Sequence, residues 1–147
     1  MKVINWKEYG DLCDKLFKDI MLLKFEGVIG IGRGGIIIGT ILAHKMGIPI
    51  IYPVFVRHVG VGEEMRVVVS DLGKIQSLTK GNMLLTDDSV VTGKALNLVK
   101  SYISKNVHLK TLAVACWKFT KVKPDFVGLF VDEDFMFPYD VAPAKIL

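Results

Sequence analysis

The sequence has few cysteines and no long apolar run, and each shortage excludes a class of protein. Cys13 and Cys116 lack the spacing of metal ligands, which favours two reduced structural thiols over a disulfide framework or a zinc site. Arg33 and several glycines interrupt the most apolar stretch, residues 28–43, which falls short of the roughly 18 apolar residues of a membrane span. Residues 1–15 carry charges where a signal peptide needs an apolar segment. We therefore expect a cytoplasmic protein without a membrane partner.

The chain also lacks a strong excess of one charge. Its 19 Lys and Arg against 15 Asp and Glu give a net charge of +4, which suits a phosphate-ester substrate as well as a nucleic acid. What it has in quantity is apolar residues, which make up 51% of a chain of 147. This composition excludes intrinsic disorder, and this length predicts one domain around a single core.

Hydrophobic periodicity predicts alternating strands and helices. Helical spacing of apolar residues and stop signals such as Gly47 and Pro49 predict helices over residues 6–23, 36–46 and 93–104. Short apolar runs predict buried strands over residues 27–31, 50–56, 82–86, 109–117 and 125–131, and a strand-like piece over residues 65–70 lies inside a polar segment. Pro53 indicates an edge position or a bulge in the second strand. The alternation predicts an α/β fold with a mostly parallel sheet flanked by helices.

The ends of these strands carry the unusual chemistry. In such sheets ligands bind beyond the carboxyl ends of the strands. The first strand runs into Gly30-Ile31-Gly32-Arg33-Gly34-Gly35, which matches G-x-G-x-x-G, but residues 48–57 lack the acidic residue that a dinucleotide site needs. Backbone N–H groups at this turn could still face an anion, with Arg33 as a charged donor. The alternative is tight strand–helix packing beside a solvated arginine.

Two adjacent acids, Asp87 and Asp88, follow the strand over residues 82–86. Two neighbouring carboxylates cannot both be buried and ionised without partners, and the vicinal hydroxyls of a sugar or a divalent cation would serve. The turn that follows offers backbone N–H groups and the Thr92 hydroxyl to a phosphate monoester. It is not a Walker A loop, because Ala95 replaces the required Ser or Thr. The alternative is that Asp88 or Ser89 only caps a helix.

An apolar strand followed by Asp-Asp-x-x-x-Thr-Gly resembles the phosphoribosyl-pyrophosphate (PRPP) signature of type I phosphoribosyltransferases, and residues 32–35 resemble that family's pyrophosphate loop. The ending Phe137-Pro138-Tyr139-Asp140 is most similar to the small microbial xanthine–guanine and hypoxanthine branch. The resemblance implies one domain over residues 1–147, with a short C-terminal hood over about 118–147. It implies transfer of phosphoribosyl from PRPP to a nucleobase, a purine, with release of pyrophosphate, by a homodimer.

The resemblance also assigns roles to residues. The ribose and 5′-phosphate of PRPP would be bound by Asp87, Asp88, Ser89, Val90, Val91, Thr92, Gly93, Lys94 and Ala95. Pyrophosphate would be bound by Gly32, Arg33, Gly34, Gly35 and Arg57. Mg²⁺ would bridge PRPP oxygens and reach Asp87 and Asp88 only indirectly, while these acids and Arg33 would be the catalytic residues. The polar segment 57–70 would be a flexible loop that closes over the site, bringing Arg57, His58 or Arg66 to exclude water.

The base site departs from the family pattern. Lys118, Phe135 and Asp140 would bind the base, although Asp134 stands where the branch carries its stacking tryptophan. Val91 replaces the acid that accepts a proton from the base, and Ala95 replaces a threonine of the phosphate turn.

These departures keep two alternatives open. One is the same enzyme class acting on adenine or a pyrimidine. The other is a non-catalytic regulator that senses PRPP and binds nucleic acid, for which the scattered lysines form no clear basic face. We therefore do not expect nucleic acid as a partner.

Overall fold

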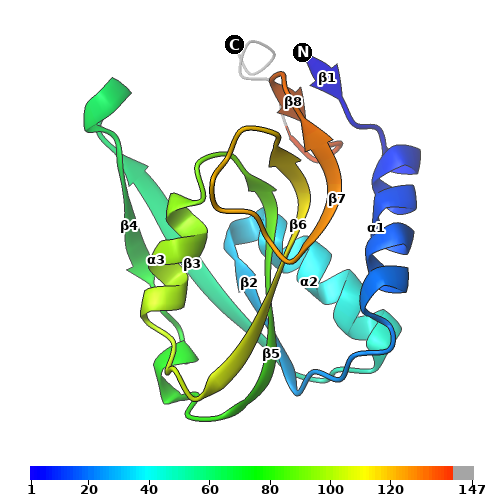
Figure 1. Cartoon of the computed structure of the whole chain (residues 1–147), viewed down its shortest axis with the longest axis vertical. Coiled ribbons are helices and arrows are strands. Elements are labelled where there is room, and N and C mark those ends of the chain that lie inside the picture. The colour runs from blue at the N-terminus through cyan, green and yellow to red at the C-terminus, as the bar shows by residue number, and fades with distance from the viewer. Residues whose placement is uncertain (141–147) are drawn as a thin grey trace.

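The computed structural model describes residues 1–140, which form a six-stranded sheet with helices on both faces and a separate pair of short strands (Figure 1). The helices are α1 (Trp6–Ile20), α2 (Gly32–Met46) and α3 (Lys94–Ser101). The strands are β1 (Lys2–Val3), β2 (Gly27–Ile31), β3 (Ile51–Val59), β4 (Arg66–Asp71), β5 (Gly81–Val90), β6 (Val107–Trp117), β7 (Phe126–Val131) and β8 (Phe135–Met136).

The large sheet has the strand order β4-β3-β2-β5-β6-β7. Only β4 runs antiparallel to its neighbour, so the predicted α/β fold with a mostly parallel sheet is confirmed. No helix within residues 1–140 is long and apolar enough to cross a membrane. Both cysteines are buried free thiols, as predicted.

The strands of the sheet centre are apolar on both faces because each face is covered. Val28 and Leu84 point into a core shared with α1 and α2. Their neighbours Ile29 and Leu85 point into a second core, shared with α3. This alternation follows from the two-residue period of a strand, and it explains why the strands read as continuous apolar runs.

The segment over residues 57–70 belongs to a β-hairpin and not to the flexible loop that the resemblance implied, whereas the strand expected over residues 65–70 is confirmed as β4. β3 continues to Val59 and pairs antiparallel with β4, with a register shift between Phe55 and Val56. Phe55 is the first residue of β3 that pairs with β4. Pro53 therefore has no partner in β4, and its missing N–H costs no hydrogen bond on that side of the strand. The tip of the hairpin is a single 3₁₀ turn over Gly62–Glu64.

Other boundaries also differ from the sequence prediction. β5 extends to Val90, past the predicted end at residue 86, so both aspartates lie within the strand. α2 begins at Gly32 rather than at residue 36, so the glycine-rich segment forms the first turn of the helix. β1 and β8 pair in parallel above the carboxyl end of the large sheet (Figure 1). Sequence periodicity could not detect strands of two residues. The end of the expected hood, residues 141–147, lies outside the described residues.

Candidate functional site

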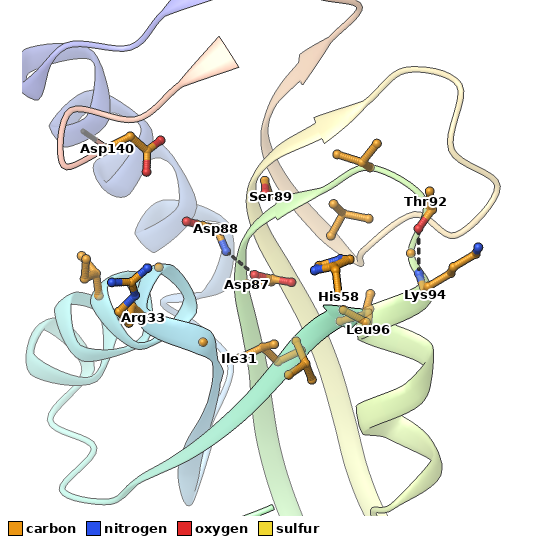
Figure 2. Close-up of a pocket in the computed structure, with 18 of the residues that line it drawn as sticks. Ile31, Arg33, His58, Asp87, Asp88, Ser89, Thr92, Lys94, Leu96 and Asp140 are labelled. Atoms are coloured by element: carbon orange, nitrogen blue, oxygen red, sulfur yellow. Dashed lines mark hydrogen bonds between the residues drawn. The ribbon is translucent and has the colours of Figure 1, made fainter. Parts of the chain in front are cut away.

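A cleft of about 1170 Å³ opens at the carboxyl ends of β2, β3 and β5 (Figure 2). Its walls come from the first turn of α2, from residues 87–96, from the end of β3, and from the segment 136–140 that follows β7. Figure 2 shows Arg33 on one side of the two aspartates and His58 with Lys94 on the other. The cleft therefore lies where ligands bind in parallel α/β sheets.

The last part of β5 carries the two aspartates. Asp87 is buried, with 9% of its surface exposed, and its Oδ1 accepts a hydrogen bond of 2.8 Å from the backbone N–H of Asp88. Burial raises the pKa of Asp87 well above its usual range, and the charge of Asp88 adds to this rise. A cation or a hydroxyl donor in the cleft would stabilise the ionised pair.

Asp88 lies between two other parts of the cleft wall. Its Oδ2 accepts a hydrogen bond of 2.9 Å from Tyr139 Oη, in the turn after β8. A side chain at Gly34, in the first turn of α2, would collide with this same carboxylate. Burial and then the charge of Asp88 raise the pKa of Tyr139, so this hydroxyl stays protonated and acts as a donor.

The first turn of α2 lies at the cleft, and we call it an anion cradle because backbone N–H groups at a helix start can bind an anion. Its N-cap, Ile31, makes no side-chain cap hydrogen bond, so the backbone N–H groups that begin the helix are available to a ligand. Gly32 has a φ of 65°, which favours glycine. Thr86 Oγ1 donates a 2.8 Å hydrogen bond to the carbonyl oxygen of Gly35, which fixes this turn against β5 beside Asp87.

The start of α3 forms a second anion cradle. Gly93 caps the helix with a φ of 82°, and Val122 fills the space that a side chain would need there. The backbone N–H of Lys94 donates to Thr92 Oγ1 at 3.2 Å (Figure 2). Lys94 itself lines the cleft and brings a positive charge to a turn in which Ala95 lacks a hydroxyl.

Most of the residues expected to hold PRPP therefore gather in the cleft. Of the residues expected at the site, those that line the cleft are Gly32, Arg33, Gly34, Asp87, Asp88, Ser89, Val90, Val91, Thr92, Gly93, Lys94, Ala95 and Asp140. Asp140 also caps its own turn, because its Oδ2 accepts a 2.7 Å hydrogen bond from the backbone N–H of Phe137.

Four expected residues are not part of the cleft lining within residues 1–140, namely Gly35, Arg57, Lys118 and Phe135. Lys118 forms an ion pair of 2.9 Å with Asp132, and Phe135 packs edge-on against Phe137. Gly35 is buried and packs against β5, where a Cβ atom would lie 2.6 Å from the carbonyl oxygen of Thr86.

His58 and Tyr139 also line the cleft. The sequence places His58 only among the residues of a closing loop, and it predicts no role in the site for Tyr139. His58 precedes Val59 at the end of β3, and Arg57 is paired opposite Val68 of β4. Adjacent residues of a strand point to opposite faces, so recognising β3 as a strand to residue 59 would have separated His58 from Arg57. No local signal identified the contact of Tyr139 with Asp88, because 51 residues separate them.

No protein-family model matches the sequence, and no curated protein matches it. Solved structures do match. A purine phosphoribosyltransferase from Pyrococcus horikoshii aligns with a TM-score of 0.83 and 23% identity over 96% of this chain and 95% of that one. A xanthine-guanine-hypoxanthine phosphoribosyltransferase from Helicobacter pylori aligns with a TM-score of 0.84 and 15% identity over 99% and 97%.

The chain has the type I phosphoribosyltransferase fold. A hypothetical protein from Neisseria gonorrhoeae with bound ppGpp shares this phosphoribosyltransferase fold, with a TM-score of 0.77 and 18% identity over 99% of this chain and 93% of that one. In each case the alignment spans nearly the full length of both chains. The likeness therefore includes the strand ends that build the cleft.

Proposed function

We propose that the protein transfers phosphoribosyl from PRPP to a nucleobase, a purine, and releases pyrophosphate. One observation carries the proposal: two anion cradles, at the starts of α2 and α3, flank a pair of adjacent carboxylates in one cleft. PRPP has this order of groups, with a phosphate and a pyrophosphate on either side of a ribose. Two structural neighbours are described as purine phosphoribosyltransferases, which supports a purine as the acceptor.

Different residues of the cleft act on different parts of PRPP. Asp87 and Asp88 bind the ribose hydroxyls, and the turn before α3 binds the 5′-phosphate. Displacement of pyrophosphate from the anomeric carbon builds positive charge on the ribose ring and negative charge on the leaving group. Arg33 and the first-turn N–H groups of α2 stabilise the leaving group, and the fixed carboxylates hold the sugar in place.

Mg²⁺ fits this site as a companion of PRPP rather than as a resident metal. Residues 1–140 contain no group of three or more His, Cys, Asp or Glu side chains that could hold a metal ion. Burial and the charge of Asp88 raise the pKa of Asp87, so a nearby positive charge would stabilise its ionised form. Mg²⁺ on the pyrophosphate oxygens would neutralise the leaving group, with Asp87 and Asp88 reaching the metal through water or through PRPP.

The base would lie beside Val91 and beneath the turn of Asp140. We propose Phe135 as an apolar wall and Lys118 as a donor to the base. Lys118 must first leave Asp132, and this ion pair is weak because both side chains are exposed to solvent. We also propose a homodimer, in which a second copy would cover the exposed apolar side chains of the β3–β4 hairpin, Phe55, Val61 and Met65.

The proposal is tested by incubating the protein with Mg²⁺, PRPP and a panel of purine and pyrimidine bases while following the release of pyrophosphate. We expect release that depends on a purine. Release only with a pyrimidine would correct the substrate, and no release with any base would exclude the enzyme.

A second candidate is a regulator that binds PRPP without turnover. It is favoured by one observation, the absence of an acid at Val91, which faces the cleft with 49% of its surface exposed. PRPP binding without pyrophosphate release in the panel assay would identify this function.

His58→Ala is expected to raise the Kd of Mg·PRPP about 5-fold, whereas Arg57→Ala leaves it within 2-fold. The imidazole lines the cleft, where it can donate to a phosphate, and Arg57 does not line it. Titration calorimetry of both variants measures the difference. A larger loss in Arg57→Ala would show that the hairpin rearranges when PRPP binds.

Gly34→Ala is expected to raise the Kd of Mg·PRPP at least 10-fold, because the new methyl group displaces the carboxylate of Asp88. Gly10→Ala is the matched control: no atom outside its own helix lies within 4 Å of the added carbon. The control should bind PRPP normally and gain about 0.5–1 kcal/mol of stability, since Gly10 lies inside α1. Normal binding by Gly34→Ala would contradict the assigned place of Asp88.

A further inference from the structure

Tyr139 connects the end of the described chain to the carboxylate that would bind ribose. Its hydroxyl donates to Asp88 Oδ2 at 2.9 Å, across 51 residues of sequence. The same carboxylate lies against Gly34, where any side chain would collide with it. One carboxylate group therefore touches three parts of the cleft wall: the α2 turn, the end of β5 and the turn after β8.

Aromatic packing fixes the ring of Tyr139. Phe137 stacks on it with the ring centres 5.4 Å apart and the planes at 14°. Tyr9 of α1 meets it edge-on at 5.7 Å, and Trp6 lies at 6.3 Å. Because rings on two elements hold it, the Tyr139 hydroxyl has a defined position relative to α1 and to β8.

The hydrogen bond leaves Asp88 able to bind a ligand. A carboxylate has two oxygens and about four acceptor directions, and Tyr139 uses one direction on Oδ2. Oδ1 remains for a ribose hydroxyl. A hydrogen bond to one oxygen fixes the rotation of the carboxylate, and so removes orientational freedom that ligand binding would otherwise have to restrict.

We propose that Tyr139 is a positioning residue for PRPP: its hydroxyl holds the Asp88 carboxylate in the orientation that a ribose hydroxyl requires. This inference rests on the proposed function, because it takes PRPP as the ligand. It goes further in giving the β1–β8 side of the cleft a role in binding the sugar. Whatever moves the turn of Tyr139, such as a base bound beneath it, then changes the affinity for PRPP, and by linkage PRPP changes the affinity for the base.

The opposing explanation is that Tyr139 is only an aromatic packing residue. Tyr139→Phe separates the two, because it keeps the ring and removes the hydroxyl. Inorganic pyrophosphate with Mg²⁺ is the discriminating probe: it would occupy the α2 turn but has no ribose, so it offers Asp88 no sugar hydroxyl to bind. Tyr102→Phe is the matched control, since Tyr102 is 39% exposed at the end of α3 and lies outside the cleft lining within residues 1–140.

We expect Tyr139→Phe to raise the Kd of Mg·PRPP about 10-fold, which corresponds to 1.4 kcal/mol. The Kd of Mg·pyrophosphate should stay within 2-fold of wild type, and turnover should show a raised KM for PRPP with a smaller change in kcat. The control should match wild type for both ligands.

Each other result overturns a stated claim. If wild type itself fails to bind Mg·PRPP, the proposed function is wrong. If wild type binds and Tyr139→Phe binds equally well, only the positioning role is wrong. If the Kd values of PRPP and pyrophosphate rise together, Tyr139 supports the cleft as a whole through packing, which also contradicts the positioning role.

Discussion

Replacing Asp87 and Asp88 together by asparagine is expected to raise the Kd of Mg·PRPP at least 100-fold and to abolish turnover. The two carboxylates are the only acidic groups that β5 brings to the cleft, between the two anion cradles. An amide of the same size keeps the shape but loses the charge that binds ribose hydroxyls and, through water, the metal on PRPP. Titration calorimetry and pyrophosphate release measure the two effects.

The matched control removes the same charge elsewhere. Asp11→Asn with Asp14→Asn changes two exposed acids of α1 and should leave the Kd of PRPP within 2-fold, because neither residue is part of the described cleft lining. PRPP binding that survives in the Asp87/Asp88 variant would show that the ribose lies elsewhere. An equal loss in the control would show that net charge, rather than the site, carries the binding.

Asp87→Asn alone is expected to stabilise the unliganded protein at pH 8. Burial, and then the charge of Asp88, raise the pKa of Asp87 in the folded state above the 3.8 of the free side chain. A group with a raised folded pKa contributes most to stability below its unfolded pKa, and that contribution is lost as the pH rises through the folded pKa. At pH 8 the raised pKa of Asp87 therefore lowers the free energy of unfolding of wild type, and the uncharged asparagine variant does not have this penalty.

Each unit of pKa difference is worth about 1.4 kcal/mol, and 1 kcal/mol shifts Tm by roughly 2–4 °C in a domain of this size. We expect Asp87→Asn to melt at least about 3 °C above wild type at pH 8, and the gain to shrink as the pH falls toward 4. Calorimetric melting across this range measures it.

Asp132→Asn is the control for this measurement, because Lys118 lowers the pKa of Asp132 at an exposed site. The ionised Asp132 therefore stabilises the fold, so its removal should lower Tm at pH 8 instead of raising it. If the rise in Tm of Asp87→Asn is independent of pH, or if Tm falls at pH 8, then Asp87 does not have a raised pKa in the folded protein.

The parts of the site that the sequence predicts are those built by consecutive residues. The glycine-rich turn follows β2 directly and the two acids lie in the last part of β5, so in both cases the carboxyl end of a buried strand places them at the cleft. The sheet itself was predictable for a similar reason, because strands covered on both faces read as apolar runs.

The parts that the sequence does not predict depend on distant contacts. The pairing of β1 with β8 joins Lys2 to Phe135, and no periodicity exists in strands of two residues. Tyr139 reaches Asp88 only because rings from α1 and from the turn after β8 pack together. The sequence predicts a strand near each of β3 and β4, but charge and glycine after residue 56 concealed the extension of β3 that carries His58 into the cleft.

The most direct test of a two-cradle PRPP site is equilibrium binding of Mg·PRPP to the wild-type protein, with ribose 5-phosphate and pyrophosphate as separate competitors. The cleft geometry predicts one saturable PRPP site from which each competitor alone displaces PRPP, because each occupies one cradle. Both competitors should also bind the protein together. Absence of saturable PRPP binding, or displacement by only one of the two compounds, would contradict the assignment of this cleft to PRPP.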